Sequence, residues 1–406
     1  MDAVNTGHDR DEPRRSAGGI SRRTLVGLAG GVPLLWLAST PARAAGRGQA
    51  AARLTSVGTA RTSGANVNGQ LGTGSPSGRL TFGSVTPSPQ LVEVAGGREH
   101  ALALDTSGQV LAWGDNAKGQ VGVGSRVDRT TLTVVAGLPV AVTVACGHYH
   151  SAAVLADGTV RTWGMNLRGQ LGDGSTTNRL SPVAVPGLTN VVMVRGGADM
   201  TVALLADGTL RTWGLGSEGQ LGNGGLASSR VPVKVAGLTD VVDMAGGRDH
   251  FVAVRSDGTV WAWGRNKSGS LGDGTKVNRS TPVRCGTLTG AVQVAAGADH
   301  SLARLADGSV WAWGESGRGQ TGTGSKMDRT TPVRVTGVPA AKAIGCGRDH
   351  ALVCTNAGEL WGWGMNDFGQ LGDGSTTTRL SPVKASVTGT PAMAHGGRNY
   401  SVVLAT

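Results

Sequence analysis

A repeat of 50 residues runs through the chain and decides what it can fold into. Tryptophan recurs at this interval six times and histidine five times, with Met200 and Tyr400 at the two remaining histidine positions. The tryptophans are Trp113, Trp163, Trp213, Trp263, Trp313 and Trp363, and the histidines are His100, His150, His250, His300 and His350. A repeat without insertions predicts identical supersecondary units that stack side by side, because a single unit cannot bury its own apolar face.

Each period has the pattern of four short strands. Residues 241–245, 251–254 and 260–263 are rich in β-branched, aromatic and small apolar side chains, and residues 232–235 form a more polar, outer type of strand. Asp257 and Gly258 separate two of these segments and are typical of a tight hairpin. No segment has the 3.6-residue periodicity of a helix. Four antiparallel strands in about 50 residues predict one blade of a β-propeller.

The two ends of the chain indicate how the blades form a ring. Residues 58–72 match residues 158–172, with Ser63 at the tryptophan position, so the repeats begin at the third strand of a blade. Residues 396–404 end after the second strand of a blade, and residues 57–406 span 350 positions, which is seven periods. We therefore predict an all-β, seven-bladed propeller of four-stranded antiparallel blades over residues 45–406. Residues 57–90 and 391–406 would combine into the blade that closes the ring, which removes exposed strand edges.

Three recurring motifs resemble the repeat family named for the regulator of chromosome condensation. They are Gly-x-x-His at 247–250, Asp-Gly-x-Val-x-x-Trp-Gly at 257–264 and Gly-Gln-Leu-Gly-x-Gly at 369–374. The resemblance covers residues 57–406 and implies a seven-bladed propeller. The chain departs from the repeat at Ser63, Met200, Gly216, Ser229 and Tyr400. We interpret these positions as imperfect copies.

The first 44 residues have the features of an export signal. Arg22 and Arg23 precede an apolar run at 25–37 that is too short to favour a membrane-spanning helix, and Ala42-Arg43-Ala44 offers a cleavage site. This order resembles a twin-arginine signal, although Leu25 replaces the usual Phe. We expect an exported protein, in the extracellular space, the periplasm or the cell wall, with no transmembrane span after cleavage. A retained N-terminal anchor and a basic disordered leader are the alternatives.

Charge and aromatic content narrow the classes of partner. The net charge is +11, but lysine and arginine are dispersed in ones and twos. A diffuse positive field gives weak contact with any anionic polymer and no specific nucleic-acid recognition. Nine of the ten tryptophans belong to the repeat, either at the tryptophan position or two residues before it. Few rings are then left to stack on bases or sugars.

Residues that could carry chemistry have simpler structural explanations. Side chains present in nearly every blade are explained by what every blade needs, so the histidines indicate buried hydrogen bonding and no metal ring. Turns such as Gly72-Thr73-Gly74 lack the following helix of a phosphate loop, and Asp173-Gly174 and Asp273-Gly274 lack the spaced carboxylates of a calcium site. We predict no catalytic residue, no metal site and no cofactor.

The four cysteines are predicted to be free thiols. Cys146 and Cys346 occupy equivalent positions on blades nearly opposite each other, too far apart for the roughly 7 Å that a disulfide allows. Cys285 and Cys354 stand where most other blades carry aliphatic residues. All four are expected to be buried.

Two classes of function fit these features. The best-known eukaryotic member of the family is a nucleotide-exchange factor for a nuclear GTPase that works through a wedge inserted in its propeller, so the resemblance implies an exchange-factor-like regulator as one reading. The repeat here never breaks, which leaves no room for such a wedge. We therefore favour an exported, non-enzymatic, monomeric protein-binding scaffold that uses one face, as similar secreted bacterial propellers do when they cap and inhibit β-lactamases. Binding to cell-wall polymers and an enzymatic role are lesser alternatives.

The candidate binding face is predicted from two nearly identical stretches. Residues 163–183 and 363–383 differ at Leu167 and Arg168 against Asp367 and Phe368, with a milder change at position 178 against 378. The first and third connections of an antiparallel blade share one face, and they are the connections whose residues vary. Anchors rich in Tyr, Trp and Arg dominate interface energies. The predicted anchors are Tyr149, Arg168, Arg265 and Phe368, and the predicted surrounding residues are His148, Leu167, Asp367, Arg98, Arg248 and Arg348.

Overall fold

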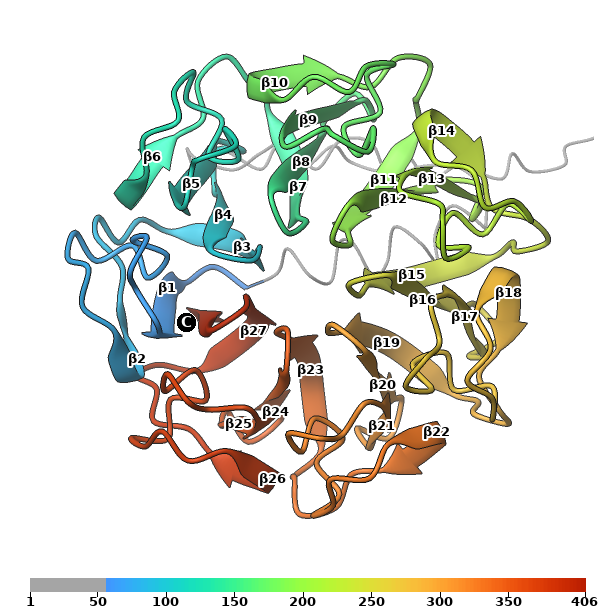
Figure 1. Ribbon diagram of the computed structural model, residues 1–406. Helices are drawn as coiled ribbons and strands as arrows, with labels where there is room; N and C mark the ends of the chain where they lie inside the picture. The colour runs from blue at the N-terminus through green and yellow to red at the C-terminus, as the bar shows by residue number, and fades with distance from the viewer. Residues whose placement is uncertain (1–55) are drawn as a thin grey trace, which may run out of the picture. The chain divides into compact units, whose positions relative to one another are not determined.

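Seven antiparallel sheets of four strands each surround a central axis (Figure 1). The computed structural model describes residues 56–406. The predicted seven-bladed propeller is confirmed over this range. The export signal predicted for residues 1–44 lies outside the described residues. No helix of residues 56–406 is long and apolar enough to cross a membrane.

Each blade runs from an inner strand at the axis to an outer strand at the rim. The inner strands are β3 (Leu91–Gly96), β7 (Ala141–Cys146), β11 (Val191–Gly196), β15 (Val241–Gly246), β19 (Ala291–Ala296), β23 (Ala341–Cys346) and β27 (Pro391–Gly396). The second strands are β4 (His100–Asp105), β8 (His150–Leu155), β12 (Met200–Leu205), β16 (His250–Arg255), β20 (His300–Leu305), β24 (His350–Thr355) and β28 (Tyr400–Ala405). The third strands are β1 (Thr59–Gly64), β5 (Val110–Gly114), β9 (Val160–Gly164), β13 (Leu210–Gly214), β17 (Val260–Gly264), β21 (Val310–Gly314) and β25 (Leu360–Gly364). The outer strands are β2 (Arg79–Ser84), β6 (Arg129–Val134), β10 (Arg179–Ala184), β14 (Ser229–Lys234), β18 (Arg279–Arg284), β22 (Arg329–Arg334) and β26 (Arg379–Lys384).

The outer strands begin earlier than their sequence suggests. The pattern predicts a strand at 232–235, whereas β14 begins at Ser229. In this blade the third strand pairs with the outer strand up to Thr212, where the register shifts. Pairing resumes beyond the shift, with Gly214 opposite Ser229. A short polar segment on the far side of a bulge has no alternation that could mark it as strand.

The ring closes as predicted, by pairing the two ends of the chain. The closing sheet has the order β2-β1-β28-β27, and β1 pairs with β28 over six residues, from Thr59 opposite Ala405 to Gly64 opposite Tyr400. Ser63 lacks the tryptophan ring of the other blades, but Phe82 on β2 is buried and replaces it. A Cβ built on Gly372 would meet the Phe82 ring, as a Cβ on Gly322 would meet the Trp363 ring. The blade that closes the ring therefore has a buried aromatic ring like the other blades, but a different strand supplies it. This corrects the interpretation of Ser63 as merely an imperfect copy.

Neighbouring blades are joined at a backbone carbonyl in the long loop that links the third and outer strands of the preceding blade. Gln120 O accepts the Trp163 Nε1–H at 2.9 Å and the Ser151 hydroxyl at 2.7 Å. The same Ser151 Oγ lies 3.0 Å from His100 Nε2. All six repeat tryptophans are fully buried and make the equivalent bond. The predicted structural role of these tryptophans and of the bonded histidines is confirmed at these junctions.

The side chain at the histidine position of each blade is chemically complementary, with one exception, to the side chain that faces it from the next blade. Four histidines meet a serine or threonine hydroxyl, and the pairs are His100 with Ser151, His150 with Thr201, His250 with Ser301 and His350 with Ser401. Met200 replaces histidine where the next blade offers Phe251, and both side chains belong to one apolar cluster. His300 alone among these histidines faces an alanine, Ala351, and neither of its ring nitrogens has a hydrogen-bond partner.

Deleting residues 396–406 is expected to make the protein insoluble. The deletion removes β28, which pairs with both β1 and β27, and leaves two exposed strand edges that promote aggregation. The measurement is the soluble fraction after expression, followed by thermal unfolding of any soluble material. A soluble truncation that melts cooperatively would contradict the closed ring.

Replacing Ala351 with serine is expected to stabilise the protein by about 1 kcal/mol, the usual net contribution of one hydrogen bond. The new hydroxyl would face His300 Nε2, which has no partner, and the carbonyl of Gln320, which accepts only the Trp363 Nε1–H among the side-chain donors. Denaturant midpoints measure the effect. Ala351→Cys is the matched control, because a thiol of similar size is a weak donor; equal stabilisation by both changes would show that volume, and not hydrogen bonding, is responsible.

The protein is expected to lose stability steeply as the pH falls below about 6.5. Burial lowers the pKa of four repeat histidines to about 3 and that of the fifth to about 4; they are His100, His150, His300 and His350, followed by His250. The unfolded chain titrates near 6.5 and therefore binds protons that the folded chain does not. Five such groups give a slope of up to about 7 kcal/mol per pH unit as the pH falls through the window from 6.5 to about 4. Urea unfolding between pH 8 and pH 5 measures this, and a flat profile over that range would contradict buried neutral histidines.

Candidate protein-binding face

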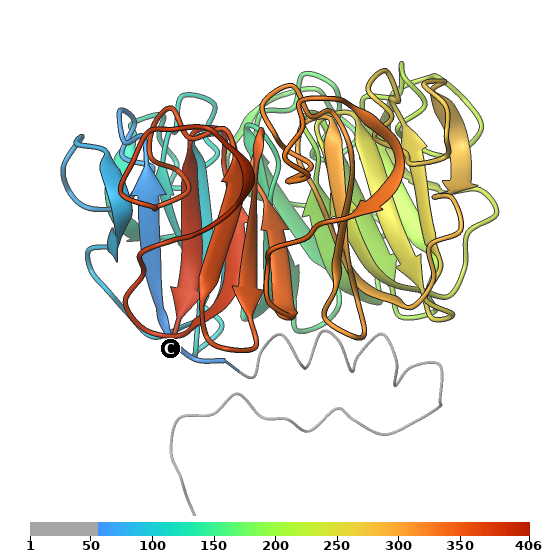
Figure 2. The ribbon, with the colours of Figure 1, turned by 90° about the horizontal axis from the view of Figure 1, so that it is seen from below.

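Two sets of connections lie on the same face of the propeller. The first set links inner and second strands, and the second set, the long loops, links third and outer strands. In every blade the first residue of the long loop donates its backbone N–H to the carbonyl at the end of the first connection, as Met165 does to Tyr149 at 2.8 Å. Gly164 makes this approach possible, because its φ is +100° and a Cβ there would lie 2.5 Å from Tyr149 O. Figure 2 shows these loops gathered on one side of the sheets, with the C-terminus on the opposite side. We call this side the long-loop face.

The long loops are held rigidly by buried amides. Asn166 donates its Nδ2–H to Asp173 and Ser175, and its Oδ1 accepts the N–H of Leu171. Gln170 Oε1 accepts the N–H of Arg168 at 2.8 Å, directly at the tip. Loop tips on such a scaffold can vary without disturbing the fold.

The aspartates considered for calcium binding have a structural partner instead. Asp173 forms an ion pair with Arg179 at 2.7 Å, and Asp273 pairs with Arg279 at 2.8 Å. Each carboxylate also accepts hydrogen bonds from the following serine or threonine. Among residues 56–406 no cluster of three or more His, Cys, Asp or Glu side chains could hold a metal ion.

The first connections form a closed ring of backbone hydrogen bonds around the mouth of the central channel. Arg98 N donates to His148 O at 3.2 Å, Ala298 N donates to Arg348 O at 2.8 Å, and Arg398 N donates to Arg98 O at 2.8 Å, which completes the circle across the seam. The other blades make similar bonds. Backbone hydrogen bonds therefore join the first connections of neighbouring blades all the way around the mouth.

Four of the predicted residues meet at this mouth. Arg98, His148, Arg248 and Arg348 occupy the same position in their blades and all line the channel entrance. Burial, together with the surrounding arginines, lowers the pKa of His148 to about 4, so this side chain is neutral at pH 7. Sequence reasoning missed Arg398, which completes the set and follows from the same 50-residue step.

Tyr149 is positioned by one of these arginines. The Arg98 guanidinium carbon lies 5.0 Å from the centre of the Tyr149 ring, in a cation–π contact. The tyrosine is half-buried, and burial raises the pKa of its hydroxyl. Tyr149 therefore presents a fixed aromatic edge beside the channel mouth.

The other predicted residues lie further from the axis, at the tips of long loops. Leu167 and Phe368 are 63% and 44% exposed, and Arg168 is also exposed. Their loops belong to the blades of β10 and β26, which lie on opposite sides of the ring in Figure 1. Asp367 pairs with Arg318 of the preceding blade at 3.2 Å. The structure thus places all ten predicted residues on one face, in an inner group and an outer group.

Arg265 differs from the other predicted anchors because it is engaged within the protein. Its Nη1 lies 3.5 Å from Asp249 and 3.4 Å from Asp299, on two different blades. Arg248 contacts the same two carboxylates at 3.0 and 2.7 Å. These four side chains form one half-buried network that stabilises the face.

Sequence reasoning missed a ring of acids on this face. Five of the seven blades carry a carboxylate directly after the residue at the channel mouth, and these acids are Glu99, Asp199, Asp249, Asp299 and Asp349. Burial raises the pKa of Asp199, Asp249 and Asp349. The signal was available in the repeat, since the position recurs every 50 residues, but a single acid in one blade is not conspicuous.

The cysteines carry no disulfide and fall into two pairs. Cys285 and Cys354 are buried, as predicted, whereas Cys146 and Cys346 are only half-buried because they line the central channel. Burial raises the pKa of Cys354 to about 12 and raises the pKa of the other three thiols as well. All four are therefore protonated, unreactive thiols at neutral pH.

The fold and the repeated junctions define the class of protein: a seven-bladed propeller whose residues 142–403 match the model of the RCC1-like domain. The chain belongs to this family. Residues 107–154 and 91–120 also match models of the regulator of chromosome condensation repeat. No curated protein sequence matches the chain.

Solved structures from human and yeast share the fold. Human WBSCR16 is 23% identical with a TM-score of 0.77, covering 86% of this chain and all of that one. Prp20p of Saccharomyces cerevisiae, described with its binding to Gsp1p and histones, is 22% identical with a TM-score of 0.78, covering 86% and 91%. Yeast RCC1 (Prp20) bound to Kap60 is 20% identical with a TM-score of 0.81, covering 97% of both chains. These similarities show the shared fold alone.

Proposed function

We propose that the protein is an exported, non-enzymatic scaffold that binds a partner protein through its long-loop face and acts by capping it. The distribution of exposed apolar side chains supports this choice of face. Of the twelve large hydrophobic residues exposed among residues 56–406, seven lie on the long loops. They are Val67, Val127, Leu167, Leu226, Val277, Met327 and Phe368. Val57 and Val140 are the ones beside the opposite face.

Rigidity of this face favours binding. The tips are fixed by buried amides such as Asn166 and Gln170, and the mouth is fixed by its ring of backbone hydrogen bonds. A partner then meets a surface that loses little conformational entropy on association. Cations and carboxylates are interleaved there, as with Arg248 and Asp299, so an anionic cell-wall polymer would gain only weak contact from this face.

The expected anchors are exposed residues at the loop tips. Leu167, Arg168 and Phe368 have exposed side chains, and Tyr149 adds an aromatic edge near the axis. Arg265 supports the surface through its ion pairs, and its contribution to a partner would be indirect.

A nucleotide-exchange role toward a small GTPase is the second candidate. The structural similarity to Prp20p, whose structure is described with binding to Gsp1p, favours it. The uninterrupted 50-residue step opposes it, because the wedge that the family resemblance implies for exchange has no counterpart in residues 57–406. Localisation and GDP release from Gsp1p, with Prp20p as the positive control, separate the two candidates. Cytoplasmic retention together with accelerated GDP release would overturn the scaffold proposal.

Arg168→Ala and Phe368→Ala are each expected to weaken partner binding about 30-fold or more, because truncation of an interface anchor costs about 2 kcal/mol or more. Both side chains are exposed, so the melting temperature should stay unchanged. The partner is first captured from culture supernatant on the immobilised chain, and affinity is then measured with the purified pair.

Asp157→Ala is the matched control for these two variants. Asp157 is exposed on the opposite face, where its carboxylate accepts two hydrogen bonds from Thr159. This change should leave the affinity unaltered. Loss of binding in the Asp157 variant, with normal binding by the two tip variants, would show that the partner uses the other face.

A further inference from the structure

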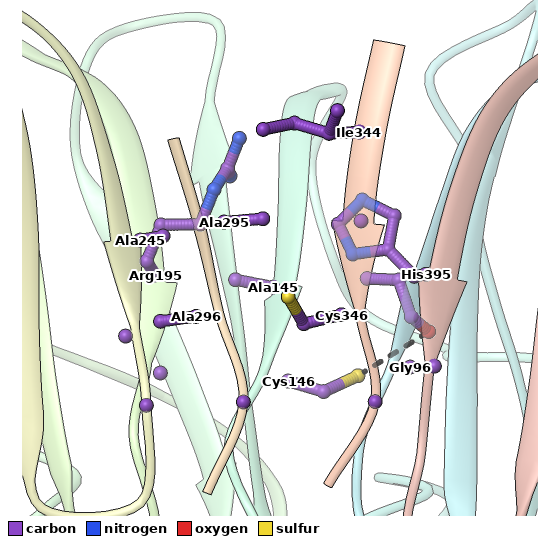
Figure 3. Close-up of a pocket in the computed structure, with 18 of the residues that line it drawn as sticks. Gly96, Ala145, Cys146, Arg195, Ala245, Ala295, Ala296, Ile344, Cys346 and His395 are labelled. Carbon is purple, nitrogen blue, oxygen red and sulfur yellow. Dashed lines mark hydrogen bonds between the residues drawn. The ribbon is translucent and has the colours of Figure 1, made fainter. Parts of the chain in front are cut away.

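A channel of about 710 Å³ runs along the propeller axis between the inner strands. Figure 3 shows part of its wall, with Arg195 on β11 and His395 on β27 extending into the space beside Cys146 and Cys346. β11 and β27 lie on opposite sides of the axis in Figure 1. The volume lies within the range of about 300–1,000 Å³ that is usual for small-molecule sites.

The side chains that line this channel have one sign of charge. Seven are lysine or arginine, two are histidine, and none is aspartate or glutamate. The cations are Arg98, Arg195, Arg248, Arg304, Lys342, Arg348 and Arg398. A cavity with walls of one sign focuses the field and concentrates ions of the opposite sign.

Three of these cations depart from the repeat, so the fold does not require them. Arg195 occupies a position that is alanine in four other blades, and Lys342 occupies one that is valine in five others. Arg304 replaces the leucine, valine or cysteine of the other blades. At each of these three positions the other six blades carry small or apolar residues, except that His395 occupies the position of Arg195 in the last blade. The same chain thus shows that the uncharged alternatives are compatible with the structure.

The nearest acids do not face the channel space. Glu93 and Asp243 lie on inner strands but are buried, and each carboxylate accepts a backbone N–H of the next blade, from Val144 and Val294 respectively. At the mouth, three of the five acids follow an arginine and two follow an alanine, and none of the five lines the channel. The mouth arginines form ion pairs with these acids, as Arg348 does with Asp349 and Arg248 does with Asp299. Cations therefore form the inner layer and carboxylates the layer behind it.

The cations are distributed along the channel. Lys342 lies near the start of β23, Arg195 near the end of β11, and the mouth arginines just beyond the inner strands. At about 3.3 Å per residue, the stretch of β23 from Lys342 to its end at Cys346 is about 13 Å long, and Arg348 lies beyond that end. A single phosphate spans only a small part of that length, whereas a short chain of phosphates can contact several levels at once.

We propose that the channel binds a small linear oligophosphate, with Arg195, Arg304 and Lys342 as its inner contacts and the mouth arginines at its entrance. Arginine and lysine both form charge-assisted hydrogen bonds with phosphate oxygens. The inner contacts of this site are separate from the loop tips, whereas the mouth arginines border Tyr149 on the proposed protein-binding face. Either function can fail without the other.

Calorimetric titration of the full chain with sodium tripolyphosphate at constant ionic strength tests the site. We expect saturable binding of one tripolyphosphate per chain and weaker binding of inorganic phosphate. Arg195→Ala and Lys342→Val introduce residues that other blades already carry. Each should weaken the affinity at least tenfold, because a hydrogen bond to a charged group contributes about 1.5–3 kcal/mol and tenfold corresponds to 1.4 kcal/mol.

Arg211→Ala is the matched control, since it removes one positive charge from β13 outside the channel lining. This variant and Arg168→Ala should bind tripolyphosphate as the unaltered chain does. Melting temperatures establish that each variant is folded; if Arg195→Ala is not, Lys342→Val carries the test. Absence of saturable binding, or an equal loss in the Arg211 variant, would overturn the proposal, because the positive charge would then act diffusely over the surface.

Discussion

A single backbone carbonyl in each long loop receives donors from the next blade, and the rest of the structure depends on this junction. Gln120 O illustrates it, with the Trp163 indole and the Ser151 hydroxyl both directed at one acceptor. The acceptor belongs to a loop and the donors to two strands, so the junction fixes loop, second strand and third strand together. An inserted residue between these groups would displace them, and a buried polar group without a partner costs about 1–3 kcal/mol. This explains why the 50-residue step is unbroken over residues 57–406, and why the long loops are tied to the sheets.

The sequence alone was sufficient for the fold because everything that repeats is structural. The blade count, the strand order within a blade and the closing of the ring all follow from the positions of Trp, His and Asp-Gly. What could not be predicted is compensation across space. Phe82 replaces the ring missing at Ser63 from a different strand, and Phe251 faces Met200 from the next blade. Both substitutions look like defects when one period is aligned with another, and they become matched pairs only when neighbouring blades are placed side by side.

The candidate face shows the same division between what can and cannot be predicted. Antiparallel connectivity was enough to place Tyr149, Arg168 and Phe368 on one side of the molecule, and the structure confirms that placement. The role of Arg265 was not accessible, because Asp249 and Asp299 reach it from two blades that are 50 residues apart in sequence. A charged residue that looks free in one period can be an internal ion-pair partner in the assembled ring. The expectation that all four cysteines are buried was wrong for Cys146 and Cys346 for a related reason: residues at the end of an inner strand face the axial channel, which a single blade does not reveal.

Residues vary between blades in two places, the loop tips and the central channel, and the variation has a different energetic cost in each. At the loop tips, residues are exposed and can change at little cost, so variation there carries limited information by itself. In the central channel the situation is different, because a charge surrounded by protein loses hydration and needs a compensating interaction. At the position of Arg195 four blades carry alanine, which avoids that cost entirely. Charged residues have nevertheless accumulated there on several blades and with one sign. The small and apolar residues at the equivalent positions of the other blades show that a blade can fold without these charges, and binding of an anion is the role that we propose for them.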